Sequence, residues 1–208
     1  MEDNVRKLST IAVCSITAAT TLFAVGTTAW SANFDNMFKT ANANWDCRDG
    51  ERDNGLFCRT DNAEMTIVRE PGMTSQGDKD IVTTLRNEYS PTDLKVYIES
   101  EGVYNGDTET DIVYDYHEYG GNIKGVTWCN DAVSDTKCDQ HYVEFDDTDP
   151  TMNEICHETG HAVGLTHGAQ ASPPQDQRAA VLGCMRAYAN SSYRDLGSHN
   201  TSMINGAY

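Results

Sequence analysis

The stretch "DKDIVTTLRNEY", residues 78–89, is the first regular pattern of apolar and polar positions along the chain. Its apolar side chains recur at helical intervals, at Ile81, Val82, Leu85 and Tyr89. Because the Ser-Pro pair that follows disfavours the helical conformation, this helix should end there.

Four segments after this helix have the alternating or β-branched apolar residues that predict strands. They are "DLKVYIES" (93–100), "TDIVYDY" (110–116), "GGNIKGVTWCN" (120–130) and "QHYVEFDD" (140–147). We expect the segment from Cys129 to Cys138 to be the loop between the last two. Upstream, where the sequence is polar and irregular, "EMTIVRE" (64–70) is a further candidate strand.

The stretch "DTDPTMNEICHETGHAVGL" predicts a second helix, from about residue 150 to 163. Asp149 is a favourable N-cap, Pro150 suits the first helical position, and Gly164 suits a left-handed stop after the last turn. One stripe of this helix should be buried, namely Met152, Ile155, Cys156, Thr159, Ala162 and Val163. At the end of the chain, "SHNTSMINGAY" predicts a capped terminal helix.

The N-terminal region is typical of a secretory signal peptide. Arg6 and Lys7 are followed by no charged residue until Asp35, and small residues suit cleavage near positions 29–32. The uncharged stretch is also long enough for an uncleaved membrane anchor, which is the alternative interpretation.

Removal of the leader takes Cys14 with it and leaves six cysteines, an even number that suggests disulfides in an exported chain. Six cysteines allow about fifteen pairings. We favour two local pairs, each closing a short loop rich in Asp, Asn and Gly, and a third pair from the cysteines that remain. These pairs are Cys47–Cys58, Cys129–Cys138 and Cys156–Cys184.

Composition narrows the choice of partners. The formal net charge of −17 argues against a nucleic acid or an anionic membrane surface, because both would be repelled. A hydrophobic content of 38% over 208 residues suits one folded domain.

The run "EICHETGHAVGLTHG", residues 154–168, holds three of the six histidines. Because residues four apart share a helix face, His157 and His161 present two imidazoles to one point. Gly164 lets the chain turn, so that His167 can supply a third nitrogen. A catalytic zinc takes three protein ligands and keeps a fourth position open, which this spacing satisfies.

Glu158 follows His157 directly and projects beside the two ligands of the helix. It is the candidate general base, which takes a proton from the attacking water and returns it to the leaving amine. The implied reaction is hydrolysis of an amide or peptide bond. Two alternatives stay open: a secreted zinc-containing binding protein without catalysis, and a metal-dependent hydrolase of non-peptide amides or esters.

The string "HETGHAVGLTH" matches H-E-x-x-H-x-x-G-x-x-H and resembles the zinc motif of the metzincin metallopeptidases. A looser similarity, closest to the matrixins, covers residues 78–208. The resemblance implies an α+β fold, with a twisted mixed sheet, a long zinc-binding helix and a small C-terminal subdomain. The chain would then comprise a signal peptide (1–32), an N-terminal extension with a disulfide loop (33–77) and a metzincin-like catalytic domain (78–208).

The resemblance also implies roles outside the zinc motif. Met185 in "LGCMRAY" would be the methionine of the turn beneath the metal. The strand residues Gly125, Val126, Thr127 and Trp128 would form the edge of the cleft, where an extended peptide adds itself as an antiparallel strand. We therefore expect a secreted, monomeric zinc endopeptidase that acts on extended peptides or proteins, with no nucleic acid partner and no membrane contact once the leader is removed.

The chain departs from the matrixin pattern at the second, structural zinc site. Only His117 and His141 could correspond to its histidines, so we expect this site to be absent. For these two residues and His199, a structural or surface role is the simpler interpretation. A calcium ion is a further candidate cofactor, because carboxylates cluster at Asp146, Asp147 and Asp149. A helix N-cap and solvated charges explain the same aspartates equally well.

Overall fold

The structure is a computed structural model that describes residues 33–50, 57–106, 108–187 and 192–208. The expected signal peptide, residues 1–32, lies outside the described residues. Within the described part, no helix is both long enough and apolar enough to cross a membrane.

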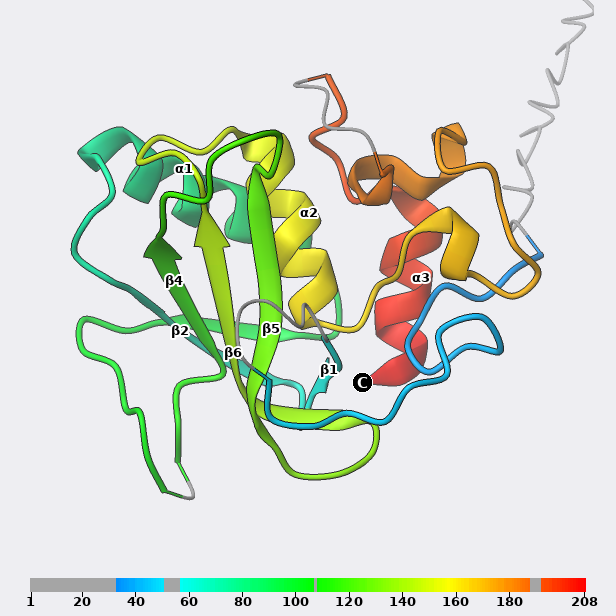
Figure 1. Ribbon diagram of the computed structural model, residues 1–208, viewed down its shortest axis with the longest axis horizontal. Coiled ribbons are helices and arrows are strands. Elements are labelled where there is room, and N and C mark those ends of the chain that lie inside the picture. The colour runs from blue at the N-terminus through cyan, green and yellow to red at the C-terminus, as the bar shows by residue number, and fades with distance from the viewer. Residues whose placement is uncertain (1–32, 51–56, 107, 188–191) are drawn as a thin grey trace, which may run out of the picture. The chain divides into compact units, whose positions relative to one another are not determined.

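Six strands form one mixed, mostly parallel sheet (Figure 1). Five of them are parallel and lie in the order β1-β6-β4-β2-β3, and β5 pairs antiparallel with β6 at an edge. Their bounds are β1 (Arg59–Thr60), β2 (Glu64–Arg69), β3 (Lys95–Ile98), β4 (Ile112–Tyr116), β5 (Gly125–Ala132) and β6 (Lys137–Phe145).

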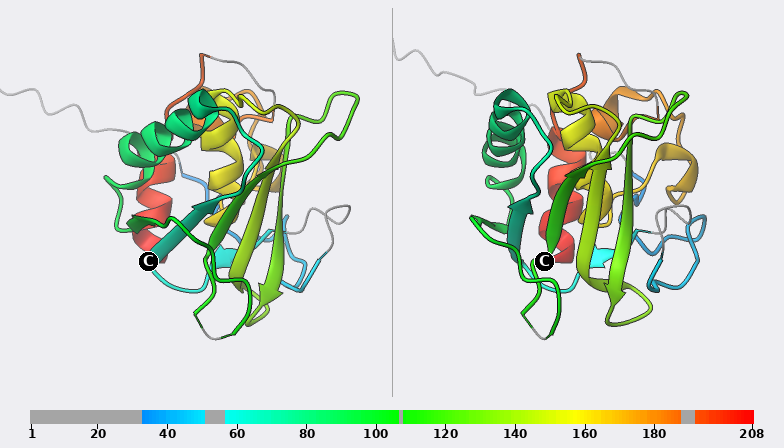
Figure 2. Two further views of the ribbon diagram at one scale, coloured as in Figure 1. Left: turned by 90° about the vertical axis from the view of Figure 1, so that its left-hand side faces the viewer. Right: turned by 60° about the vertical axis from the view of Figure 1, so that its left-hand side comes forward.

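Helices cover one face of this sheet. Helix α1 (Ser75–Thr84) continues into a π-helical turn, Leu85–Tyr89, and lies beside α2 (Met152–Ala162), which packs on β5 and β6 (Figure 2). The last helix is α3 (Gly197–Ala207). Two short 3₁₀ turns, Gly168–Gln170 and Ala180–Met185, lie between α2 and α3 in the chain.

The main core lies between the sheet and the helices. The helical positions Ile81, Leu85 and Tyr89 are fully buried there, as their spacing predicts. They meet apolar side chains that alternate along the central strands, among them Ile67, Ile112 and Phe145 of β2, β4 and β6, and the buried stripe of α2. The predicted helices and strands are therefore confirmed, and most of them contribute residues to this core.

Residues 33–77, expected as an extension, take part in the same sheet. This segment contains β1 and β2, and β2 lies between β3 and β4. The side chains of Met65 and Ile67 are fully buried in the core. They face the same side because side chains alternate along a strand. Residues Ser31–Tyr208 accordingly belong to one unit.

The three expected disulfides are all formed in the structure, and they are compatible with an oxidising, extracellular environment. They are Cys47–Cys58, Cys129–Cys138 and Cys156–Cys184. The first two lie together in a second, smaller core with Phe38 and Ala43.

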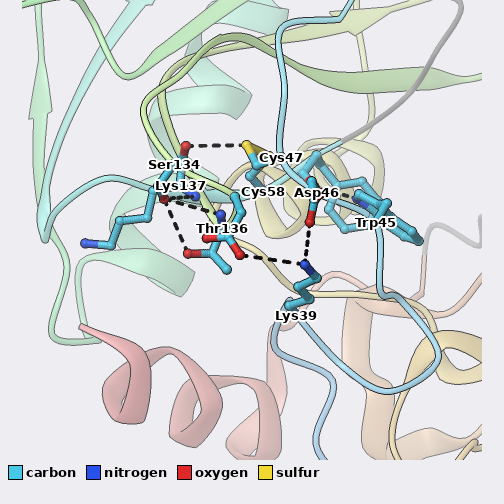
Figure 3. A network of polar contacts seen from close by, with 10 residues as sticks. Lys39, Trp45, Asp46, Cys47, Cys58, Ser134, Thr136 and Lys137 are labelled. Carbon is cyan, nitrogen blue, oxygen red and sulfur yellow. Dashed lines mark hydrogen bonds and ion pairs between the residues drawn. A yellow bond between two sulfur atoms is a disulfide. The ribbon is translucent and has the colours of Figure 1, made fainter.

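Polar contacts join the N-terminal segment to this smaller core. The Lys39 ammonium forms an ion pair with Asp46 at 2.7 Å (Figure 3). It also forms one with Asp135 at 3.7 Å, and the Cys47 N–H donates to the Asp135 carbonyl. The segment before Cys47 is thereby attached to the turn between β5 and β6.

The loop between β5 and β6 does lie between Cys129 and Cys138, but it is shorter than predicted because both ends of this segment are strand. β5 continues to Ala132 and β6 begins at Lys137, and the disulfide joins the two strands. The polar residues here resembled a loop because one face of an antiparallel pair can face water.

Helix α2 begins later than predicted, because its N-cap is Thr151 and not Asp149. The Thr151 side chain accepts from the Glu154 N–H, and the Glu154 carboxylate accepts from the Thr151 N–H at 2.8 Å, which together form a capping box. The Asp149 carboxylate instead accepts from the Thr74 hydroxyl. The predicted cap of the terminal helix is also wrong, because the N-cap Leu196 makes no side-chain hydrogen bond.

Replacement of Thr151 by alanine should therefore lower the free energy of unfolding by about 1 kcal/mol, the usual contribution of an N-cap. For a domain of this size the melting temperature should fall by about 2–4 °C. Asp149→Ala is the matched control and should change it by less than about 1 °C. Thermal melts of both variants would contradict the capping assignment if Asp149→Ala had the larger effect.

Candidate metal centre

Three histidine side chains converge on one point. His157 and His161 extend from the same face of α2, and His167 follows the turn after the helix. Their Nε2 atoms lie 3.1 Å apart for His157 and His161, 3.1 Å for His161 and His167, and 2.9 Å for His157 and His167. The structure thus brings together the three histidines that the spacing singled out.

Gly164 makes the turn that brings His167 back to the helix. Its φ is +92°, in the left-handed region that favours glycine. A Cβ atom here would also lie 2.4 Å from Cγ of Arg59 and 3.0 Å from the sulfur of Met37. Both the backbone angle and the close packing therefore require glycine at this position.

Backbone carbonyls set the tautomers of the two helical ligands. Nδ1 of His157 lies 2.8 Å from the Cys184 oxygen, and Nδ1 of His161 lies 2.8 Å from the Leu165 oxygen. Because a carbonyl only accepts, each Nδ1 carries the proton and each Nε2 presents a lone pair. This is the orientation that a metal-binding histidine needs.

The charge state of the histidines also suits a metal. Burial, and then the neighbouring imidazoles of His167 and His157, hold the pKa of His161 well below its usual value. Burial, and then His157, lowers the pKa of His167 to about 3. The imidazoles of His161 and His167 are therefore neutral near pH 7, as metal ligands must be.

The donor set fits zinc better than a hard cation. Zinc–nitrogen bonds of about 2.0–2.1 Å in a tetrahedral site place ligand nitrogens about 3.3 Å apart, close to the separations found here. Three imidazoles without a carboxylate or carbonyl ligand are also atypical of magnesium or calcium.

Glu158 lies beside the three histidines and is almost buried, with 8% of its surface exposed. The Thr127 hydroxyl lies 2.9 Å from its Oε2 and 2.9 Å from its main-chain oxygen. Burial raises the pKa of Glu158, whereas the charge of His157 and the hydrogen bond from Thr127 oppose that rise.

Gly125 makes room for this carboxylate. A Cβ atom on Gly125 would lie 2.7 Å from Cγ of Glu158 and 3.0 Å from its Oε1. Gly125 and Thr127 lie on the same face of β5, because side chains alternate along a strand. Sequence reasoning assigned both to a substrate-binding strand and missed their contact with Glu158. The alternation of side chains along the strand could have indicated that both face the same neighbour.

Trp128 lies on the other face of β5 and away from the histidines. Its ring packs edge-on against Tyr142 with 4.4 Å between the centroids. The remaining residues of the expected strand, Gly125, Val126 and Thr127, line a cleft of about 490 Å³ together with the three histidines and Glu158.

Met185 lies directly beneath α2 at the level of the ligands. It is fully buried, and a Cβ atom on Gly160 would come within 2.2 Å of its sulfur. The preceding residue, Cys184, supplies the carbonyl that orients His157 and the disulfide to Cys156. One short segment thus packs under the helix, bonds to it covalently and orients one of the histidines.

Phe57 is a wall of the site that sequence reasoning missed. Its ring stacks on His161 with 4.3 Å between centroids and an interplanar angle of 25°. The adjacent Cys58 is joined to Cys47, so this disulfide holds Phe57 near the histidines. Only its position next to a cysteine could have indicated such a role.

The aspartates considered for calcium do not gather around one point. Carboxylates of Asp146 and Asp147 accept backbone N–H groups of nearby residues, and Asp149 accepts from Thr74. Among the described residues, the acidic group whose oxygens do converge is Glu109, Asp131 and Asp139.

The other histidines have structural surroundings. His117 packs edge-on against Tyr119, and His141 is fully buried in β6, where burial lowers its pKa to about 3. Neither belongs to a converging group of ligand atoms in the described part of the chain. The ring of His199 packs at a tilt against that of Phe34.

Comparisons with known proteins add little to this geometry. No family model matches the sequence, and no curated protein matches it. Among solved structures, the crystal structure of myroilysin, a metallopeptidase, matches with a TM-score of 0.36 and 15% identity, over 62% of this chain and 55% of that chain. The chain therefore spans about half the length of the chain it matches. A likeness this weak carries no argument about function, which rests on the site itself.

The site predicts that the chain binds zinc in equimolar amount and is stabilised by it. Zinc at about 100 times its Kd should raise the free energy of unfolding by about 2.7 kcal/mol over the chelated protein. His161→Ala should abolish this increase, and the control His117→Ala should retain it. Calorimetry with and without zinc is the measurement, and an increase that survives His161→Ala would contradict the assignment.

Proposed function

We propose that the chain is a secreted zinc endopeptidase of the metzincin type, which hydrolyses peptide bonds in extended substrates. The observation that carries the proposal is the convergence of the Nε2 atoms of His157, His161 and His167 beside the buried carboxylate of Glu158, all facing one cleft. The disulfides support secretion, and a monomer with its leader removed is the form we expect to be active.

The three histidines would hold the ion through Nε2. Zinc bound there supplies a Lewis acid that polarises a carbonyl oxygen and makes water a stronger acid. Glu158 would act as the general base of the reaction. Because the Thr127 hydroxyl is bonded to Oε2, the other oxygen, Oε1, is left to accept a proton from water and return it to the leaving amine.

The edge of β5 would align the substrate. Its residues from Gly125 to Thr127 line the cleft, and β5 pairs with β6 on one side only among the described strands. Farther along the same edge, the Cys129 carbonyl accepts from the Gly50 N–H at 2.9 Å. An extended peptide would therefore pair with the first half of β5 and end where Gly50 covers the edge.

The packing under the helix supports the metzincin type in particular. Met185 packs against Gly160, which lies between His157 and His161 in the sequence. The third histidine follows the turn at Gly164. Support for catalysis over metal storage comes from Glu158, which Gly125 and Thr127 accommodate although burial of a carboxylate is unfavourable.

Glu158→Gln should retain zinc and lose hydrolysis. The amide keeps the size of the side chain but cannot take a proton, so kcat should fall by at least about 10²–10⁴-fold. The measurements are zinc content and cleavage of a peptide library, with and without chelator. The exposed Glu118 offers a control, because Glu118→Gln should leave both unchanged. Substantial turnover by Glu158→Gln would overturn its role as base.

Thr127→Val should impair Glu158 without disturbing the metal. Valine has nearly the shape of threonine but lacks the hydroxyl, and a hydrogen bond to a charged group contributes about 1.5–3 kcal/mol. We expect kcat/KM to fall by about 10-fold or more at unchanged zinc content, and Thr127→Ser to restore it. Equal activity of the valine and serine variants would show that the hydroxyl has no role.

A further inference from the structure

The N-terminal segment, residues 34–42, runs along the loop that carries His167. Asp35 and Ser172 exchange main-chain hydrogen bonds of 2.9 and 2.7 Å, and the Phe38 N–H donates to the Gly164 carbonyl at 2.7 Å. The loop from residue 164 to 172 is thus held on one side by a part of the chain more than a hundred residues earlier.

The contacts next to His167 come from Asn36. Its main-chain oxygen accepts from the Thr166 N–H at 2.8 Å and from the Thr166 hydroxyl at 3.1 Å. Its side-chain Nδ2 donates to the Thr166 oxygen at 3.3 Å. Asn36 therefore bonds to both the N–H and the carbonyl of the residue that precedes the third ligand.

The main chain fixes His167 on its other side too. The His167 N–H donates to Oε1 of Gln170 at 3.2 Å, and its carbonyl accepts from the Gln170 N–H at 3.0 Å. A carbonyl bonded to Nδ1 orients each of the rings of His157 and His161. The backbone of the third ligand is held on both sides, which helps to fix its position.

Asn36 is itself anchored to the last helix. It is fully buried, and its Nδ2 donates to Oδ1 of Asn200 at 2.9 Å. Its Oδ1 lies 3.0 Å from Nε2 of His199, which donates because the amide oxygen only accepts. One buried amide therefore connects α3 to the loop of the third ligand.

We propose that Asn36 is a positioning residue for His167, which fixes the third metal ligand by holding the backbone of Thr166 against α3. This inference rests on the proposed metal centre. Removal of the amide leaves polar groups of Thr166, Asn200 and His199 without their partner in a buried site, so the loop can shift. A shift of the loop changes the metal geometry even though Asn36 does not touch the metal.

The test compares two asparagines of the same segment in the mature protein. Asn36→Ala removes the amide beside His167, and Asn42→Ala removes a similar bond, 2.6 Å from Nδ2 to the Ala171 oxygen, farther along the same loop. Zinc affinity is measured by competition with a chromophoric chelator, and cobalt(II) absorption reports the ligand geometry. Melting temperatures in chelator report stability without metal.

We expect Asn36→Ala to weaken zinc binding by about 10-fold, the low end for groups that support a metal ligand, and to alter the cobalt spectrum. Asn42→Ala should lower the melting temperature in chelator but leave zinc affinity within about two-fold of the wild type. If Asn36→Ala does not fold, Thr166→Val tests a neighbouring contact of the same two residues, because it removes only the bond from the Thr166 hydroxyl to the main-chain oxygen of Asn36. It should weaken zinc binding by about two- to three-fold.

Wild-type zinc affinity and cobalt spectrum in the folded Asn36→Ala variant, or in Thr166→Val where the former is unfolded, would overturn the inference. An equal loss of affinity in Asn42→Ala would also overturn it, because the effect would then be general loosening of the loop. Failure of the wild-type protein to bind zinc would refute the metal centre itself. This outcome is distinguishable from failure of the inference about Asn36, because it is observed in the wild-type protein.

Discussion

The Nε2 atoms of three imidazoles lie about 3 Å apart, so their lone pairs would repel one another, and a cation between them would remove the repulsion. The surrounding structure keeps these lone pairs aimed at one point. Carbonyls of Cys184 and Leu165 hold the protons on the far side of two rings, and burial lowers the pKa values of His161 and His167. The glycine turn, the packing under α2 and the stacked ring of Phe57 all maintain this arrangement.

Two glycines contribute to the site because they have no side chain. Gly125 leaves the space that Glu158 fills, and Gly160 leaves the space that Met185 fills. A methyl group at either position would push aside a side chain of the site. Both glycines lie within regular elements, where glycine usually weakens the structure, so close packing at the site accounts for their presence.

Local sequence rules predicted a large part of the fold and the centre of the site. The interval from His157 to His161 and the turn at Gly164 depend on helix geometry alone, so the sequence was sufficient. The contact of Thr127 with Glu158 was missed, as were Phe57 and Asn36, because these contacts join residues far apart in the chain and no local pattern specifies which elements meet. The N-cap of α2 was misplaced for another reason. Asp149 and Thr151 are both good caps, and the reciprocal bond between Thr151 and Glu154 decides between them.

The connection through Asn36 also has a consequence for how the protein forms. Its partners lie 130 and 164 residues away along the chain. Contacts of such separation pay a large loop-closure entropy and form late in folding. The two histidines on α2 can come together as the helix forms, whereas His167 is held only after residues 34–42 and α3 have docked. Completion of the proposed metal site would thereby be coupled to completion of the fold, and a partly folded chain would offer an ion only an incomplete set of ligands.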